Sequence, residues 1–336
     1  MLYENSNAEK FFGNLCSSLK KSSENIIIIA VVNCAENSPL HFKEDNQKLL
    51  SRLLHNEFAI PNLAVIDCTS PGRCLKNGVG EARKNGMDYA LTLFDCADFE
   101  NSIIASLDAD TEIEEDYFKK IRAGFIQYPQ TGVLTFDVQH IMDAENPAAI
   151  AQYELYLKAY RDGLEYAGSP YAFYTVGSAF ATRASSYIQS GGMRKLKAGE
   201  DFYFLQSAVK SSKVSHYPQV TVHPSARNSA RVPFGTGTAL QSITANEKDF
   251  TPFPQYAFDA LKKILDAAET ENLRDPETFF AAIPPELHSF FIAANFAADW
   301  KKVIANMPES QLCNAFVLHW FDGLKTLQFL KFAAAR

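Results

Sequence analysis

Short apolar segments alternate with helix-like segments through the N-terminal part of the chain, and this alternation limits the folds open to it. Apolar runs predict strands at 26–32, 63–66, 103–107 and 132–138. Between them, apolar residues recur at helical spacing, which predicts helices at 8–20, 43–54, 80–94 and 117–128. Alternating strands and helices of this length are typical of an α/β fold, with a parallel sheet and helices on both of its faces.

The character of the sequence changes near residue 250. Helix-like segments follow at 255–270, 276–282, 286–304 and 310–332, with prolines between them. We therefore predict an α/β domain over residues 1–245 and a C-terminal helical region over 246–336. That region either packs on the α/β domain or mediates an interface, such as that of a homodimer. Its lysines among apolar residues fit a membrane surface, but a packed amphipathic helix is the commoner use of this pattern.

Composition narrows the classes of partner. The net charge of −7 and the pI near 5.6 argue against a dedicated nucleic-acid binder. The N-terminal sequence lacks the cationic start and apolar core of a signal peptide, and the aliphatic stretch 26–32 is too short to span a bilayer. We expect a cytoplasmic protein whose membrane contact, if it has one, is peripheral at the inner face. Six cysteines without a Cys-x-x-Cys pair favour buried, reduced thiols.

Three predicted strands are followed directly by polar residues, namely Asn33, Asp67 and Asp108. Ligands of parallel α/β sheets bind outside the carboxyl ends of the strands, so these residues predict a binding site on one rim. Asp110 adds a second carboxylate two residues after Asp108. Such oxygens suit Mg²⁺ or Mn²⁺, which usually take one or two carboxylates together with substrate phosphates. Asp-x-Asp pairs also occur in solvated loops, and that alternative stays open at this point.

Several segments, in their order along the chain, resemble the family-2-like glycosyltransferases of the GT-A fold, in their soluble bacterial form. The first are 31–37 (Val-Val-Asn-Cys-Ala-Glu-Asn), 65–70 (Val-Ile-Asp-Cys-Thr-Ser), 80–86 (Gly-Glu-Ala-Arg-Lys-Asn-Gly) and 108–110 (Asp-Ala-Asp). The resemblance continues at 177–183, 191–193 (Gly-Gly-Met), 199–201 (Gly-Glu-Asp) and His223. It covers residues 25–235, and it departs from the commonest pattern where Lys84 separates an arginine from an asparagine.

The resemblance implies a Rossmann-like sheet, mixed to mostly parallel, with flanking helices. It implies Asp201 as the catalytic base. The donor-binding residues that it implies are Asn33, Asp67, Arg83, Asp108 and Asp110. The metal ligands for Mn²⁺ or Mg²⁺ that it implies are Asp108, Asp110 and His223. On the acceptor side or in the following loop it places Gly177, Glu200, Arg227 and Arg231.

The activity implied by the resemblance is transfer of a sugar from a UDP- or GDP-linked donor to a hydroxyl of a glycan or lipid-linked acceptor, in cell-surface polysaccharide synthesis. The residues alone are compatible with this chemistry. A single displacement needs an ion at the leaving diphosphate, a base for the hydroxyl proton and a nucleotide pocket. Asp201 begins a predicted helix, whose partial positive charge is expected to keep its carboxylate ionised. One such displacement inverts the anomeric centre.

Each residue assignment has a plainer alternative. Glu200 and Asp201 are also ordinary helix-start acids, and Asp67 is also a turn former before Ser-Pro-Gly. Arg83 is by default a solvated helix cation. His223 is either a loop histidine or a metal ligand. The two loop arginines, 227 and 231, either contact a diphosphate from a mobile loop or are solvated.

Three other classes of protein are alternatives to the glycosyltransferase. A nucleotidyltransferase of similar α/β fold should carry a glycine-rich phosphate loop after the first strand, where this chain has Asn-Cys-Ala-Glu-Asn at 33–37. A dehydrogenase should carry a third glycine three residues after Gly78-Val79-Gly80, but position 83 of this chain is Arg83. A non-catalytic nucleotide-binding or interaction protein stays open, because a fold does not fix a function.

Overall fold

The computed structural model describes residues 8–141, 147–226, 236–245, 250–270, 273–305 and 307–336. Contacts between Cα atoms divide the chain into two compact units. Unit 1 comprises Met1–Glu154 with Phe173–Asp249, and unit 2 comprises Leu155–Ala172 with Phe250–Arg336. Helix α5 (Pro147–Tyr166) therefore contributes residues to both units, so they are not two contiguous halves of the sequence.

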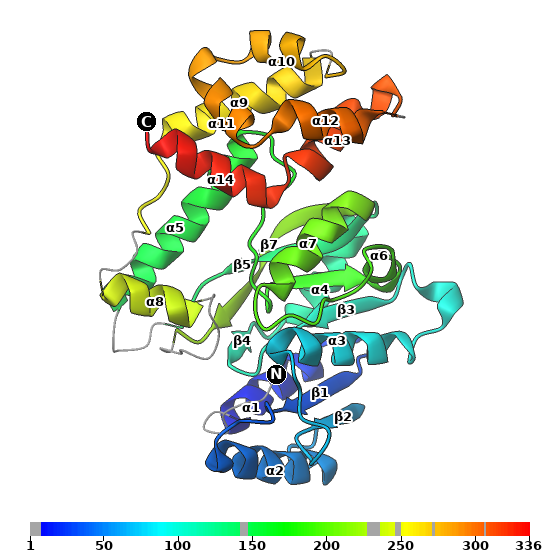
Figure 1. Cartoon of the computed structure of the whole chain (residues 1–336). Coiled ribbons are helices and arrows are strands. Elements are labelled where there is room, and N and C mark those ends of the chain that lie inside the picture. The colour runs from blue at the N-terminus through cyan, green and yellow to red at the C-terminus, as the bar shows by residue number, and fades with distance from the viewer. Residues whose placement is uncertain (1–7, 142–146, 227–235, 246–249, 271–272, 306) are drawn as a thin grey trace. The chain divides into compact units, whose positions relative to one another are not determined.

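Unit 1 begins with the predicted alternation of helices and strands, drawn from blue to green in Figure 1. Its first half contains α1 (Ala8–Lys21), β1 (Ile28–Asn33), α2 (Leu40–Leu54), β2 (Leu63–Cys68), α3 (Gly78–Leu91), η2 (Cys96–Asp98), β3 (Ile103–Ser106), β4 (Thr111–Ile113) and α4 (Tyr117–Gln127). Its second half contains β5 (Thr131–Val138), β6 (Phe180–Arg183), α6 (Ala184–Gln189), α7 (Glu200–Ser211), β7 (Lys213–Pro224) and α8 (Thr236–Thr244). The eight elements predicted between residues 8 and 138 are confirmed, with ends that move by a few residues.

The arrangement of the strands corrects the prediction of a mostly parallel sheet. Strands β1 and β2 form a parallel pair of their own, with Val32 opposite Asp67. The other five strands form a mixed sheet in the order β3-β6-β5-β7-β4, in which only β5 and β7 run parallel. The prediction failed because β4 and β6 are too short to show as apolar runs, and both of them enter the sheet antiparallel.

Helices cover both faces of the five-stranded sheet, as the alternation predicts. Phe136 of β5 packs on Tyr117 of α4, with ring centroids 6.1 Å apart, and Ala181 of β6 belongs to the same core. Successive residues on a strand point to opposite faces. Phe180 therefore lies on the other face, where its ring contacts Phe204 of α7 at 5.3 Å. This double cover fixes the strand ends that carry the candidate site.

Unit 2 is helical and holds an aromatic core. Besides the C-terminal part of α5, it contains α9 (Gln255–Thr270), α10 (Pro276–Ala282), η3 (Pro285–Leu287), α11 (His288–Ala293), α12 (Phe296–Ile304), η4 (Glu309–Gln311), α13 (Leu312–Ala315), η5 (Phe316–Trp320) and α14 (Gly323–Ala334). Trp300 is fully buried and stacks against Phe296 at 5.8 Å. Packing of such rings supplies both contact area and specific geometry.

Two of the predicted C-terminal helices are confirmed, and the other two were predicted as continuous helices but are broken into shorter ones. Those at 255–270 and 276–282 match α9 and α10. The predicted helix 286–304 is broken at Asn295, whose φ of +54° is left-handed, a conformation that asparagine tolerates better than most residues. The predicted helix 310–332 is broken before α14, where Asp322 caps the new helix by accepting from the backbone of Leu324 and Lys325.

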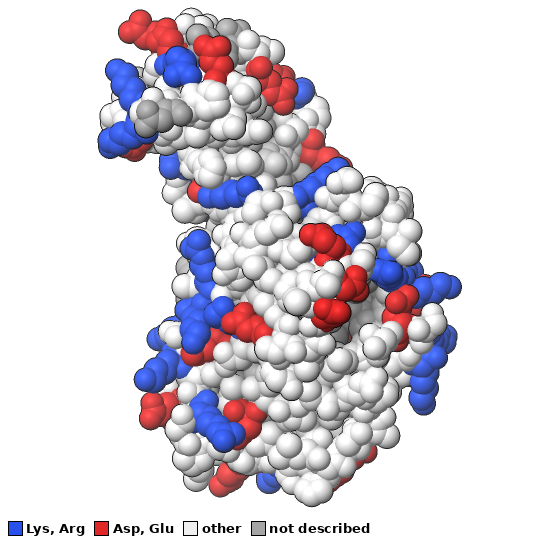
Figure 2. Space-filling view, turned by 90° about the vertical axis from the view of Figure 1, so that its right-hand side faces the viewer, with Lys and Arg blue, Asp and Glu red and all other residues white. Residues whose placement is uncertain are grey.

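The surface mixes charges of both signs. Figure 2 shows lysines and arginines interspersed with acidic residues on the face that it displays. None of the helices that the structure describes combines the length and the hydropathy needed to cross a membrane.

A glycine of α5 shows how tightly unit 2 is packed, and it provides a stability test. A Cβ on Gly163 would lie 2.3 Å from Cζ of Phe258 on α9. We expect Gly163→Ala to lower the free energy of unfolding of unit 2 by about 1–3 kcal/mol, despite a gain of about 1 kcal/mol in helix propensity. Both tryptophans, Trp300 and Trp320, lie in unit 2, so fluorescence during urea unfolding reports it.

The matched control is Gly13→Ala on α1. No atom lies within 4 Å of a Cβ built there, so only the gain in helix propensity remains. We expect it to stabilise unit 1 by up to about 1 kcal/mol in far-UV circular dichroism. A stabilising effect of Gly163→Ala would contradict the packing described for α5 and α9.

Candidate functional site

Arg83 of α3 is the centre of a buried polar cluster in unit 1. Its side chain is only 7% exposed, so it is not the solvated helix cation that the sequence left open. The guanidinium donates to Glu200 Oε1 (3.1 Å), Asp108 Oδ1 (3.0 Å), Gly177 O (2.8 Å) and Ser106 Oγ. One side chain therefore joins α3, the exit of β3, the turn before β6 and the start of α7.

Two glycines allow these segments to come close. A Cβ on Gly177 would lie 2.2 Å from Nη2 of Arg83, so any side chain there would displace the guanidinium. A Cβ on Gly80 would lie 2.5 Å from the Leu196 carbonyl oxygen, which accepts a hydrogen bond from the Gly80 N–H (3.0 Å). The N-terminal turn of α3 is thus fixed to the segment that leads into α7.

Asp108 is held from two sides. Arg83 contacts both of its carboxylate oxygens, at 3.0 and 3.3 Å. Ser178 donates to Oδ2 (3.0 Å), and the Ser178 Oγ accepts from the Asp108 N–H (3.2 Å) and from Thr111 Oγ1 (3.0 Å). The position of this carboxylate is therefore set before any ligand binds.

The electrostatics of the pair are those of a matched ion pair. Burial raises the pKa of Asp108, but Arg83 and the Ser178 hydroxyl outweigh it, so the pKa lies below its usual value. Burial lowers the pKa of Arg83, and Asp108 and Glu200 more than reverse this. Both groups are charged at neutral pH.

Asp108 and Asp110 offer the chemistry of a divalent cation site. Asp110 lies in the turn between β3 and β4, where its carbonyl oxygen accepts from the Ser225 N–H (2.9 Å) and its side chain is half-buried. No group of three or more His, Cys, Asp or Glu side chains among the described residues is arranged to hold a metal ion. Two carboxylates completed by substrate phosphates are a sufficient set for Mg²⁺ or Mn²⁺, so the residues present fit such an ion.

His223 lies on β7 opposite Glu112 of β4. Its Nδ1 donates to the Gln139 carbonyl oxygen (3.0 Å). Since the described side chains form no three-residue metal group, His223 is not assembled with Asp108 and Asp110 as the third ligand that the resemblance implies. Its role as a ligand stays a prediction.

Asp201 corrects one expectation about charge. It occupies the first turn of α7, behind Gly199, whose φ is +73°. The helix start was expected to keep the carboxylate ionised. Instead, burial and the neighbouring Glu200 raise the pKa of Asp201 to about 7, although Arg83 and the Phe202 N–H, which donates to Oδ1 (2.7 Å), act the other way. Such a group exchanges a proton near neutral pH, as a general base must.

Asn33 and Asp67 share the carboxyl edge of the two-stranded sheet, whereas Asp108 follows β3, an edge strand of the other sheet. Asn33 is buried, and its carbonyl accepts from Asn46 Nδ2 (3.1 Å). Oδ1 of Asp67 accepts from the Thr69 N–H (2.8 Å), from Thr69 Oγ1 (2.9 Å) and from the Ser70 N–H (3.1 Å). Burial raises the pKa of Asp67, but these hydrogen bonds lower it below its usual value. The turn-forming alternative for Asp67 is therefore realised, and Oδ2 faces Arg73 at 3.6 Å.

The remaining predicted residues divide in two groups. Gly177 and Glu200 contact Arg83, so they belong to the cluster rather than to a separate acceptor region. Arg227 and Arg231 lie outside the described residues. Sequence reasoning missed Ser106 and Ser178, which complete the cluster. Ser178 directly follows Gly177 in a segment that carries the resemblance, and this was the one available signal.

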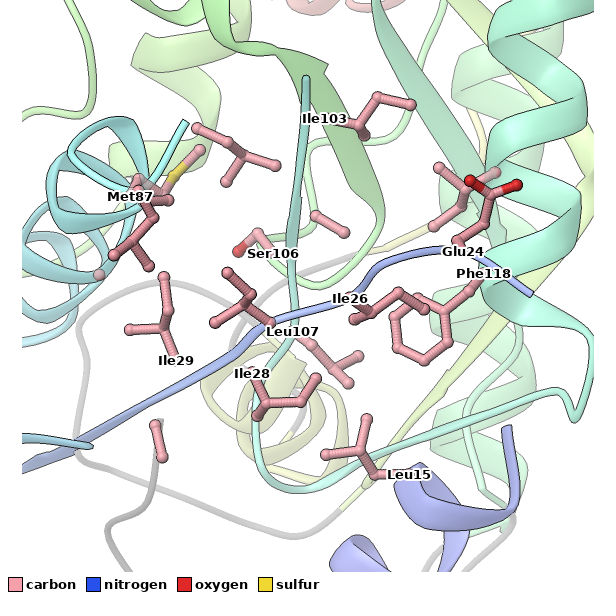
Figure 3. A pocket seen from close by; sticks show the side chains of 18 of the residues that line it. Leu15, Glu24, Ile26, Ile28, Ile29, Met87, Ile103, Ser106, Leu107 and Phe118 are labelled. Carbon is pink, nitrogen blue, oxygen red and sulfur yellow. The ribbon is translucent and has the colours of Figure 1, made fainter. Parts of the chain in front are cut away.

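A cavity of about 550 Å³ reaches the cluster from the apolar side of unit 1. Figure 3 shows Ile28 from β1 and Ile103 and Leu107 from the region of β3 lining it, with Met87 of α3 and Phe118 of α4. Arg83, Ser106 and Asp108 line the same cavity. Residues of β1 and β3 thus line one space, in which aliphatic side chains lie beside polar ones, namely those of the cluster and also Glu24, Asn25, Asp98, Asn101 and Arg122.

Fold and site together define an α/β protein with a mixed sheet, a helical C-terminal unit and a buried guanidinium–carboxylate cluster. No family model matches the sequence. No curated protein matches it either.

Two of the solved structures that are similar to this chain share little sequence with it. S. aureus TarS, residues 1–349, is 14% identical with a TM-score of 0.45, over 86% of this chain and 84% of that one. The mannosyltransferase PcManGT from Pyrobaculum calidifontis, in complex with GDP-Man and Mn²⁺, is 12% identical with a TM-score of 0.41, over 100% and 84%. Because both TM-scores are below 0.5, they support no conclusion about this chain, and its function has to be inferred from its own residues.

Proposed function

We propose that this chain is an inverting, metal-dependent glycosyltransferase that uses a nucleotide-sugar donor. The observation that carries the proposal is the convergence of two acidic motifs on Arg83. Asp108 lies 25 residues after Arg83 and Glu200 lies 117 residues after it, yet both contact its guanidinium. The candidate base Asp201 is the residue after Glu200, so the motif that carries it is held by the same guanidinium that holds Asp108.

The roles follow from the chemistry of each group. Asp108 and Asp110 would hold Mn²⁺ or Mg²⁺, which when bound stabilises the negative charge of the leaving diphosphate. Asp201 takes the proton of the acceptor hydroxyl through a carboxylate oxygen, and the hydroxyl oxygen then attacks the anomeric carbon. Attack from the face opposite the diphosphate inverts that carbon. Arg83, which the resemblance implies as a donor contact, positions both acidic motifs in this scheme.

The donor side is assigned to the shared edge of β1 and β2. Asn33 and Asp67 lie at the carboxyl ends of their strands, which is where nucleotides bind in α/β sheets. A UDP- or GDP-linked sugar is the proposed donor, and a glycan or lipid-linked hydroxyl is the proposed acceptor. The exposed lysines of unit 2, for example Lys301 and Lys302, are the proposed contact with a membrane that carries such acceptors.

Titration calorimetry with UDP and GDP, with and without Mn²⁺, tests the donor site. We expect one nucleotide to bind in the presence of Mn²⁺, and Asp110→Ala to weaken that binding at least about tenfold, because a charged ligand of the ion is lost. The matched control is Asp116→Ala, an exposed carboxylate before α4 that pairs with Lys120. It should leave the affinity unchanged. Equal, metal-independent binding by all three proteins would reject the assignment of Asp108 and Asp110.

A further inference from the structure

Two thiols meet beside the proposed donor edge. Sγ of Cys34 lies 3.4 Å from Sγ of Cys74, although 40 residues separate the two cysteines. Cys34 directly follows β1 and is buried, whereas Cys74 is half-buried in the loop between β2 and α3. Cys68, at the end of β2, is the third cysteine of this region, and its Sγ accepts from Asn85 Nδ2 (3.6 Å).

The backbone around the pair is fixed on both sides. The Leu75 N–H donates to the Cys34 carbonyl (2.9 Å), and Ala35 and Leu75 form a parallel bridge. The Cys34 N–H donates in turn to the Cys68 carbonyl (3.2 Å). The two sulfurs therefore do not meet by a chance rotation of exposed side chains, because their main chains are hydrogen-bonded neighbours.

We propose that Cys34 and Cys74 form a reversible disulfide that controls the loop after β2, whose first residues, Thr69 and Ser70, hold the Asp67 carboxylate. The sulfurs need to approach by about 1.3 Å to reach bonding distance, which is within the reach of side-chain rotation and a small loop shift. With a disulfide such as oxidised glutathione as the oxidant, the Cys74 thiolate attacks one of its sulfurs and releases one glutathione thiol. Cys34 then attacks Cys74 Sγ and releases the second. The two cysteines lose two electrons and two protons, and two glutathione thiols form.

The order of attack follows from exposure. Cys74 is the more accessible of the two sulfurs, and it lies next to Arg73 on the loop. Burial raises the pKa of Cys34 most, and the neighbouring Cys74 adds to it, so that the pKa is about 12. Cys34 is therefore a poor first nucleophile. A mixed disulfide at Cys74 therefore forms first, and its sulfur is presented to Cys34 at close range.

Thr69 links the thiols to the donor edge. Its carbonyl accepts from the Cys74 thiol (3.5 Å) and from that of Cys34 (3.9 Å). Its N–H and hydroxyl both donate to Asp67 Oδ1. Oxidation removes both S–H donors from the Thr69 carbonyl, so the turn that holds Asp67 must adjust. This consequence for nucleotide binding rests on the proposed function, whereas the disulfide itself does not.

Peptide mapping tests the disulfide on the full-length protein. Trypsin separates the three cysteines of this region into peptides 22–43 (Cys34), 53–73 (Cys68) and 74–76 (Cys74). After equilibration with mixtures of oxidised and reduced glutathione and alkylation, we expect peptide 22–43 linked to 74–76. Dithiothreitol should remove the link. Recovery of both peptides only as alkylated or glutathione-modified forms, even in the most oxidising mixture, would overturn the proposal, and so would a link to 53–73 in place of 74–76.

Variants separate the pair from its neighbours. Cys74→Ser should abolish the linked peptide, and Cys68→Ser should leave it intact. Because Cys34 is buried, a Cys34 variant that fails to fold would be uninformative, and the half-buried Cys74 is the better site to replace. Oxidised wild type should also unfold at a temperature several degrees above that of the reduced protein. The reason is that a cross-link between cysteines 40 positions apart lowers the conformational entropy of the unfolded chain. If the unfolding temperature of Cys74→Ser is the same under oxidising and reducing conditions, the increase seen in wild type comes from this disulfide.

Nucleotide titration of the oxidised and reduced protein then reads out the link to Asp67. We expect the affinity for the preferred nucleotide to change by about threefold or more on oxidation in wild type and in Cys68→Ser, and to stay constant in Cys74→Ser. A disulfide that forms without changing the affinity would overturn the control of the loop after β2. A protein that binds no nucleotide in either state, but still forms the linked peptide, refutes the proposed function alone.

Discussion

Replacing Arg83 with methionine is expected to destabilise unit 1 by about 3–5 kcal/mol. The side chain is 7% exposed, and its partners Asp108 and Glu200 have side chains that are 29% and 4% exposed. Removal of the cation would leave Glu200 as a buried carboxylate without its ion-pair partner. Methionine fills much of the volume but supplies no donor, so the loss comes from charge and hydrogen bonding rather than from a cavity.

Urea unfolding followed by two probes measures this effect. Both tryptophans lie in unit 2, so fluorescence reports that unit, whereas far-UV circular dichroism sums the helices and strands of both units. We expect Arg83→Met to move the midpoint of the dichroism transition much more than that of the fluorescence transition. Since a chain with two compact units need not unfold in one step, the comparison of the two probes is more informative than either value alone.

Lys84→Met is the matched control for this prediction. Lys84 is the next residue on α3, it is 28% exposed, and it forms an i,i+4 ion pair with Asp88 (2.8 Å). Loss of such a pair is expected to cost less than about 1 kcal/mol. Equal destabilisation by the two variants would contradict the description of Arg83 as the buried cation of the site.

The sequence predicted the chain order of helices and strands better than it predicted how the strands pair. Apolar runs such as 26–32 and 63–66 are local signals, and their strands formed where expected. The direction of pairing depends on partners far along the chain. β6 (Phe180–Arg183) separates β3 from β5 and makes the sheet mixed, and a four-residue strand leaves no periodic signal of its own.

Some features of the candidate site could likewise be predicted from local sequence, and others depend on the fold. The carboxylates could be selected because acidic residues at strand ends are unusual, whereas the convergence of Asp108 and Glu200 on Arg83 depends on three elements folding together. The pKa of Asp201 was expected in the wrong direction for the same reason. A helix start is visible in the sequence, but the burial of a side chain and the closeness of Glu200 are properties of the fold.

Asp201→Asn is expected to abolish most sugar transfer while making the protein more stable at pH 8. Loss of a general base lowers the rate about 10²–10⁴-fold. Asparagine keeps an oxygen that can accept from the Phe202 N–H, so nucleotide binding in the presence of Mn²⁺ should be retained. A kinetic assay with the nucleotide sugar selected by calorimetry measures the rate, and calorimetry on the variant measures binding.

The pH dependence follows from the raised pKa of about 7 for Asp201. Only the ionised form can accept a proton, so the wild-type rate should rise through pH 7 and level off above about pH 8. The folded protein binds the Asp201 proton more tightly than the unfolded chain does. The stability associated with that proton is therefore present at low pH and is lost as the pH rises through about 7.

Asp201→Asn removes the ionisation and with it that loss of stability. At pH 8 we expect the variant to be more stable than wild type by about 1–3 kcal/mol. This is less than the full free energy that the pKa shift of Asp201 corresponds to, because water reaches the half-buried side chain. The difference should shrink at pH 5, where Asp201 of the folded wild type is already protonated. Asp266→Asn, at an exposed position on α9, is the control and should change neither rate nor stability appreciably. A variant that keeps the wild-type rate, or one that is less stable than wild type at pH 8, would remove Asp201 from the role of base, because a loss of rate together with a gain in stability is what a base with a raised pKa predicts and a merely structural carboxylate does not.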